Sequence, residues 1–223
     1  MKRIFKWLIG LFIAAVVLVV VVVIVLLLSY NSILRMAMEH QIRAQTGMDT
    51  EIGSVNVGLF SPVAEIKDFK MHNSQKFGGA PFFDIREIHV EYDRAALSRH
   101  EIHITLLRFN LGELDIVKNE AARTNIFLPA IKLPATNSAA ANPLADFKRQ
   151  SGFEFTGIDV LNVSVGKLKY FDLKNPENNR EQDVDLEDCV IKDVKTPTDL
   201  AGLAVLIALR SGDFFGPLIN PKP

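Results

Sequence analysis

The sequence predicts a mainly β protein, in which an N-terminal transmembrane helix and a short amphipathic helix precede an elongated antiparallel sheet and a short C-terminal apolar helix. Two observations carry this prediction. Residues 8–28 form an apolar run without a single charged side chain. From residue 48 onward, apolar residues recur at every second position, which is the period of a strand with one buried face.

Composition limits the function classes. The 223 residues can hold one anchor and one domain of ordinary size, or two small repeated units. The formal net charge is −1, from 25 basic and 26 acidic residues, so a nucleic acid partner is not expected, because phosphate binding needs a basic surface. Cys189 is the one cysteine, so the fold has no internal disulfide.

The apolar run of residues 8–28 is long enough to cross a bilayer, because a helix rises about 1.5 Å per residue and the hydrocarbon core is roughly 30 Å thick. Cations flank the run unequally: Lys2, Arg3 and Lys6 before it, Arg35 and Arg43 after it. The positive-inside rule therefore places residues 1–7 in the cytoplasm and the rest across the membrane. A cleaved signal peptide is the alternative, but its apolar region would be unusually long and no small-x-small pair follows.

A connecting amphipathic helix is expected over residues 30–47. Leu34, Ala37, Met38 and Ile42 recur at helical spacing, and Gly47 is suited to the left-handed conformation that ends a helix. We expect this helix to pack on the first strands rather than to act at the membrane surface.

The first β unit is predicted over residues 48–118. Its expected strands are residues 50–59, 63–71, 83–92, 101–106 and 107–117. Short turns join them, which is typical of an antiparallel meander. Gly53 interrupts the alternation of the first strand, and we interpret it as a β-bulge.

The remaining chain is divided by composition. Its expected parts are a Pro/Ala/Asn-rich linker (119–150), a second β unit (151–195) with strands at 153–173 and 184–194, a helix (196–212) and a tail (213–223). The helix starts at a capping sequence, Thr196 to Asp199, and is too short to span a bilayer. Because it is apolar on all sides, we expect it to be buried against the sheet or across an open end of it.

One internal similarity stands out. Residues 107–114 read LRFNLGEL and residues 161–168 read LNVSVGKL, 54 positions apart. Both fit one alternating pattern with the glycine at the same place. This suggests one supersecondary unit that is used twice.

The polar residues do not form a recognisable catalytic or metal motif. His100 and His103 are three apart, and in a strand such positions face opposite ways, so one ion cannot take both. The acidic stretch 183–188 is typical of a solvated strand face, and it lacks the glycine and glutamate of a calcium loop. Cys189 follows carboxylates that disfavour a thiolate, so we expect an inert thiol. The sequence predicts no enzyme, no cofactor and no metal site.

The alternating apolar positions are the remaining candidate site. They could line a groove for acyl chains, or they could form an ordinary core covered by the helices at 32–46 and 198–210. The groove candidates are Val55, Val57, Ile88, Val90, Ile102, Ile104, Phe109, Leu111, Val163 and Val165.

Several short motifs follow the anchor in a fixed order. They are Thr46-Gly47, EIGSV at 51–55, LFSP at 59–62, DFKMHN at 68–73, KFGG at 76–79, IHVEYD at 88–93, Leu97, IHITLL at 102–107 and Asn125. Their order and spacing resemble the N-terminal part of the AsmA-like family of bacterial envelope proteins. The likeness covers roughly residues 1–126, and residues 153–194 are similar to later repeats of that family.

This resemblance implies a bacterial inner-membrane protein with a periplasmic, curved, half-pipe sheet whose inner face is apolar. It also implies a role in envelope and outer-membrane biogenesis through lipid homeostasis or lipid transport. Family members proposed as bridges are much longer. About ten strands at roughly 4.8 Å spacing would give a groove of only some 50 Å, too short to cross a periplasm.

Two functions follow as hypotheses. The protein handles membrane lipids on its apolar face, or it is a non-enzymatic anchored scaffold that binds envelope proteins, or copies of itself, through a sheet edge.

Overall fold

The computed structural model describes residues 30–58, 61–125, 148–149, 151–212 and 214. The predicted transmembrane helix (8–28), most of the predicted linker and nearly all of the tail lie outside these residues. Within the described part of the chain, no helix is both long enough and apolar enough to cross a membrane.

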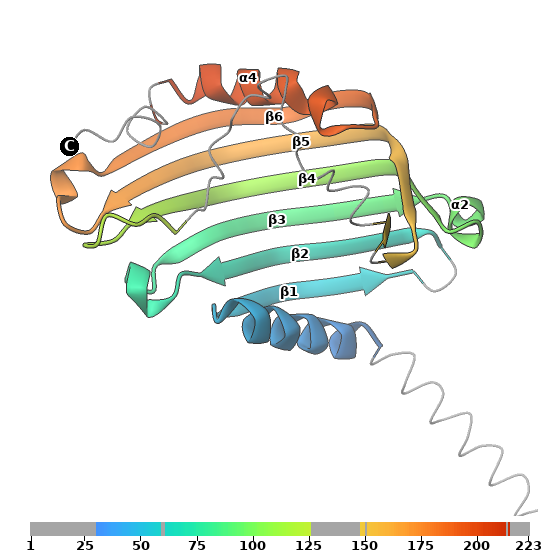
Figure 1. The fold of residues 1–223 in the computed structure, drawn as a ribbon, viewed down its shortest axis with the longest axis horizontal. Helices are drawn as coiled ribbons and strands as arrows, with labels where there is room; N and C mark the ends of the chain where they lie inside the picture. Colours follow the sequence, from blue (N-terminus) through green and yellow to red (C-terminus); the bar gives the residue numbers. More distant parts are fainter. Residues whose placement is uncertain (1–29, 59–60, 126–147, 150, 213, 215–223) are drawn as a thin grey trace, which may run out of the picture.

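The described residues form one six-stranded sheet in the order β1-β2-β3-β4-β5-β6 (Figure 1). The strands are β1 Thr50–Val57, β2 Val63–His72, β3 Pro81–Tyr92, β4 Glu101–Lys118, β5 Glu154–Asp172 and β6 Arg180–Val194. Three short helical turns connect them: η1 Gln75–Phe77, α2 Arg94–Ser98 and η2 Pro176–Asn178. The mainly β class is confirmed.

The antiparallel meander predicted for residues 48–118 is confirmed in β1 to β4. The expectation that the whole sheet is antiparallel is wrong at one junction. Strands β4 and β5 are parallel, whereas the other four pairs are antiparallel. A parallel pair needs a connection of a dozen or more residues, and residues 119–153 are long enough to return the chain to the start of β4. Alternating hydrophobicity is the same for both strand directions, so the sequence pattern could not distinguish them.

Strand β4 is a single strand of 18 residues, where two strands were predicted. The adjacent apolar residues Leu106 and Leu107 break the alternation there. In the structure Leu106 pairs with Glu91 and Ile104 pairs with Tyr92, so Thr105 is an extra residue that forms a bulge. The bulge restores the alternation without a turn, so β4 continues as one strand. The sheet has six strands, fewer than the ten or so expected from the sequence.

The region around Gly53 differs from the predicted single-strand bulge. The register between β1 and β2 is the same on both sides of Gly53, and the buried face changes in both strands together. Asp68, opposite Gly53, has a positive φ of 53°. A Cβ at Gly53 would lie 2.8 Å from the Cβ of Asp68, so only glycine fits beside this aspartate.

The two similar segments lie side by side. Leu107 pairs with Leu161, Phe109 with Val163 and Leu114 with Leu168, always at a separation of 54 residues. A Cβ on Gly166 would come within 2.5 Å of the carbonyl oxygen of Gly112. The shared glycine therefore allows the two strands to pair closely at this point.

Helices flank both outer strands (Figure 1). The helix of residues 30–46 runs beside β1 and ends at Gly47, whose φ is 67°. The turn η3 Pro197–Leu200 leads into α4 Ala201–Arg210, which lies beside β6. Asp199 accepts hydrogen bonds from the backbone N–H groups of Lys195 and Thr196, which hold the pKa of its carboxyl below the ordinary value.

The prediction that α4 is buried is wrong in part. Leu203, Leu206 and Ile207 pack against the core, but Val205 is 59% exposed and Leu209 is 75% exposed. A helix at the edge of a sheet covers it with one face only, so its other face stays outside.

Candidate functional site

The candidate site is the apolar face of the sheet, where paired residues form rows that cross all six strands. Three complete rows run from β1 to β6. They are Val57-Ala64-Val90-Leu107-Leu161-Ile191, Val55-Ile66-Ile88-Phe109-Val163-Cys189 and Ile52-Phe69-Ile85-Leu111-Val165-Leu186. Because neighbouring strands lie about 4.8 Å apart, each row is about 24 Å long.

Eight of the ten residues predicted from the sequence belong to these rows. They are Val55, Val57, Ile88, Val90, Phe109, Leu111, Val163 and Val165. Ile102 and Ile104 lie at the start of β4, beside Phe155 and Ile158 of β5.

The sequence prediction missed the contribution of β2 and β6. Ala64, Ile66 and Phe69 join the rows from β2, where Asp68 interrupts the alternation. The sequence predicts Cys189 only as an inert thiol beside carboxylates, whereas in the structure it pairs with Val163 and packs against the core. The signal that could have identified these residues is an apolar side chain that continues a row from the neighbouring strand.

Burial changes along the rows. At β5 and β6, Val163, Val165 and Leu186 are almost completely buried. Helix α4 and Phe214 pack against this end of the face. Towards β2, β3 and β4 most row residues are only half-buried, for example Ile66, Ile88 and Phe109. At β1, Ile52 and Val55 are buried as well, so the face is covered at both outer strands and more open in the middle.

The opposite face of the sheet is polar and rich in ion pairs. Lys169 and Glu113 approach to 2.8 Å across β4 and β5, and His103 and Asp159 to 3.1 Å. His100 does not join His103, because it lies in the turn before β4 and stacks near Phe153.

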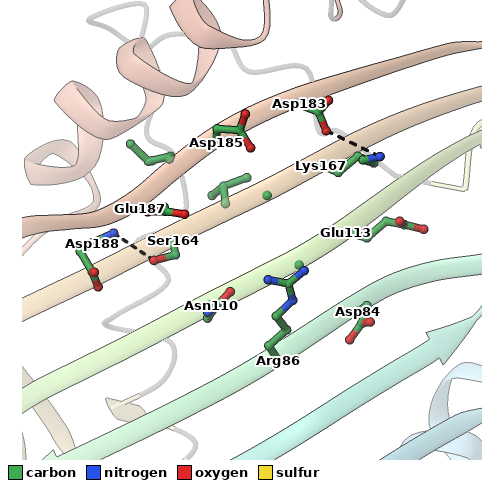
Figure 2. A pocket seen from close by; sticks show the side chains of 14 residues that line it. Asp84, Arg86, Asn110, Glu113, Ser164, Lys167, Asp183, Asp185, Glu187 and Asp188 are labelled. Carbon is green, nitrogen blue, oxygen red and sulfur yellow. Dashed lines mark hydrogen bonds and ion pairs between the residues drawn. The ribbon is translucent and has the colours of Figure 1, made fainter.

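A hollow of about 530 Å³ lies on this polar face above Gly112 and Gly166. Figure 2 shows Arg86 of β3 reaching over β4 between Asn110 and Glu113. A Cβ on Gly112 would lie 2.8 Å from Nε of Arg86, so the arginine occupies the space that the glycine leaves.

The predicted acidic stretch lines part of this hollow. Asp183, Asp185, Glu187 and Asp188 are exposed, as expected for a solvated strand face. Asp185 and Asp188 also have positive φ values and lie where the register of β6 shifts, so they form bulges on an outer strand. Bulges of this kind oppose pairing with a further strand.

Glu65, Glu87 and His89 form a group that the sequence analysis did not identify, with ligand atoms within 4.8 Å of one another. Both carboxylates already have cationic partners: Glu65 lies 3.0 Å from Lys67 and Glu87 lies 3.5 Å from Arg108. The hydrogen bond from Lys67 keeps the pKa of Glu65 below its ordinary value. The group is an ion-pair network on the polar face.

Asn125 anchors the far end of β4 in a buried polar network. Its side chain accepts a hydrogen bond from the backbone N–H of Val117 and donates to Asn73 and to the carbonyl of Asp115, each at 2.8 Å. Burial and the neighbouring Glu113 raise the pKa of Asp115 to about 7.

Comparisons of the chain with protein-family models, with curated proteins and with solved structures found no match. The resemblance to the AsmA-like family therefore stays a prediction from the motifs.

Proposed function

We propose that this protein is anchored in a bacterial inner membrane and binds lipid acyl chains on the apolar face of its periplasmic sheet, as a short β-groove in envelope lipid homeostasis. The observation that carries the proposal is the set of three apolar rows. No polar side chain interrupts them between β1 and β6.

The dimensions of the rows suit an acyl chain. Each row is about 24 Å long, and one leaflet of a bilayer has a hydrocarbon depth of roughly 15 Å. Each methylene that leaves water contributes about 0.8 kcal/mol. An apolar row can therefore hold a lipid chain without a specific polar site, and the headgroup can stay in water.

The open middle of the face favours a lipid-binding groove rather than a core that is covered by helices. Among the described helices, the helix of residues 30–46 lies at the edge of β1, α2 contacts β4 and α4 contacts β6. The half-buried side chains of β2 and β3, such as Ile66 and Ile88, offer the apolar surface that a lipid would cover.

The short sheet limits the role. A row of about 24 Å spans six strands, about half the length expected from ten. We infer that one copy holds or presents a lipid near the membrane and does not carry it across the periplasm unaided.

The alternative is a scaffold that binds envelope proteins by adding a strand to the sheet. The outer edge of β1 is already occupied: Glu39 accepts from the N–H of Ile52, and Asn31 accepts from the N–H of Val57. These contacts oppose strand addition at β1.

The proposal is tested with two matched substitutions in the full chain, purified in mild detergent and analysed for bound lipid by native mass spectrometry. Val90→Asp places a carboxylate in a row, whereas Val190→Asp places one on β6 opposite Asn162, where Val190 is 52% exposed. We expect lipid to be lost from the first variant and retained by the second. Equal lipid content in both folded variants would contradict acyl-chain binding on this face.

A further inference from the structure

The helix of residues 30–46 has two faces with different roles. Its inner face binds the edge of β1 through Asn31, Arg35 and Glu39. Its outer face carries exposed residues at helical spacing: Ile33, Met36, Ala37, His40 and Ala44. Ile33 is 49% exposed and Met36 is 55% exposed.

The outer face carries no acidic side chain. Glu39, the one carboxylate of the helix, is directed at the backbone of β1. Arg43, beside the outer face, forms a 3.2 Å ion pair with Asp49. An outer face that carries Ile33, Met36 and two alanines beside His40, with no carboxylate, is suited to the boundary between headgroups and acyl chains.

The position of the helix in the chain identifies what covers this face. The apolar run ends at residue 28, and only Ser29 separates it from the start of the described helix. Ile33 and Met36 therefore lie within one to three turns of the proposed membrane span. The exposed apolar residues of α4 have no such neighbour, because α4 lies at the opposite edge of the sheet (Figure 1).

We propose that the helix of residues 30–46 lies along the periplasmic surface of the inner membrane, with Ile33, Met36 and Ala37 in the headgroup region. Interfacial helices of this kind bury their apolar face about 5–10 Å deep. Strand β1 is then the strand nearest the membrane, and the three apolar rows start at the bilayer surface. This inference rests on the anchor in the proposed function, but it does not depend on acyl-chain binding by the sheet.

A flat helix and an upright helix place Ala44 differently. Eleven residues separate Ile33 from Ala44, which is about 16 Å along a helix. If the helix continued the span upright, Ala44 would lie in water well above the bilayer. If the helix lies flat, Ala44 stays at the depth of Ile33.

The test uses the full chain with Cys189→Ser, reconstituted into vesicles of phosphatidylethanolamine and phosphatidylglycerol. Single spin labels are attached to Met36→Cys, Ala44→Cys or Val205→Cys. Val205 is the matched control, because its exposure of 59% is close to the 55% of Met36. Accessibility to oxygen, which concentrates in lipid, is compared with accessibility to a water-soluble nickel complex.

We expect the labels at Met36 and Ala44 both to lose accessibility to nickel, and the label at Val205 to lose none. Nickel accessibility at Ala44 equal to that at Val205 would overturn the proposal, whether Met36 is protected or not, because it would place Ala44 in water. Lipid retention by the Val90→Asp and Val190→Asp variants is measured separately, so failure of the helix to lie on the membrane and failure of acyl-chain binding are distinguishable.

Discussion

Replacing Gly166 with alanine tests the pairing of the two similar segments. Gly166 has no positive φ, so alanine is compatible with its backbone and the expected effect is steric. The new Cβ would lie 2.5 Å from the carbonyl oxygen of Gly112, about 0.9 Å closer than an ordinary contact. The backbone fixes the position of the Cβ, and the carbonyl oxygen is itself a backbone atom of the paired strand, so neither can rotate away.

The size of the effect follows from known substitutions. Overpacking by one carbon costs typically 1–3 kcal/mol. Alanine also reduces the conformational freedom of the unfolded chain, which stabilises the folded state by about 0.4–1 kcal/mol and offsets part of this loss. We therefore expect a net loss of about 1–2 kcal/mol. At about 2–4 °C per kcal/mol for a chain of this size, Tm should fall by about 2–8 °C.

Gly202→Ala is the matched control. Gly202 lies in α4, and a Cβ there meets nothing within 4 Å. Alanine is more favourable than glycine inside a helix by up to about 1 kcal/mol, so the Tm of this variant should be unchanged or higher. Both variants are melted in the same detergent and followed by circular dichroism at the strand signal. A Gly166→Ala protein that is as stable as the wild type would refute the close parallel pairing of β4 and β5.

Three further predictions concern stability and the sheet edge. Asn125→Ala should lower the free energy of unfolding by about 3 kcal/mol in denaturant titrations, because buried partners lose their hydrogen bonds; a loss below about 1 kcal/mol would contradict the network. Asp115 has a pKa raised to about 7, so this side chain binds more protons in the native state than in the unfolded chain between pH 4 and 7. Its contribution to Tm should therefore fall as the pH rises through this range, opposite in sign to the contributions of Glu65 and Asp199. Asp115→Asn should reduce this pH dependence, and an unchanged profile would exclude Asp115 as its source. Glu39→Ala should speed hydrogen exchange of the Ile52 amide about fivefold, since it removes a 2.9 Å bond worth about 1 kcal/mol; unchanged exchange would show that the helix does not protect β1.

Much of the sheet could be predicted from local patterns. Strong alternation defined β1, β2, β3 and β5 to within a few residues, because each strand has one apolar face. Gly47 ended its helix as expected, since glycine takes a positive φ without strain.

The errors arose where pairing partners decide the outcome. The parallel direction of β5 depends on the long connection that precedes it, and the continuity of β4 depends on a bulge at Thr105 opposite β3. The exposed side of α4 depends on its place at a sheet edge, which hydrophobicity alone does not encode. Within the candidate site, the rows depend on the register between strands, which pairs Phe69 with Ile52 and Cys189 with Val163. The sequence alone does not give this register.

The central claim is that the apolar rows contact a lipid chain. It is tested most directly by photocrosslinking the full chain in inner-membrane-like vesicles with a phospholipid that carries a diazirine on its acyl chain, followed by peptide mass spectrometry. The account predicts crosslinks at row residues of the middle strands, such as Ile66, Ile88 and Phe109. Crosslinks confined to the polar face around Glu65 and Arg108, or absent from β2 to β4 altogether, would contradict it.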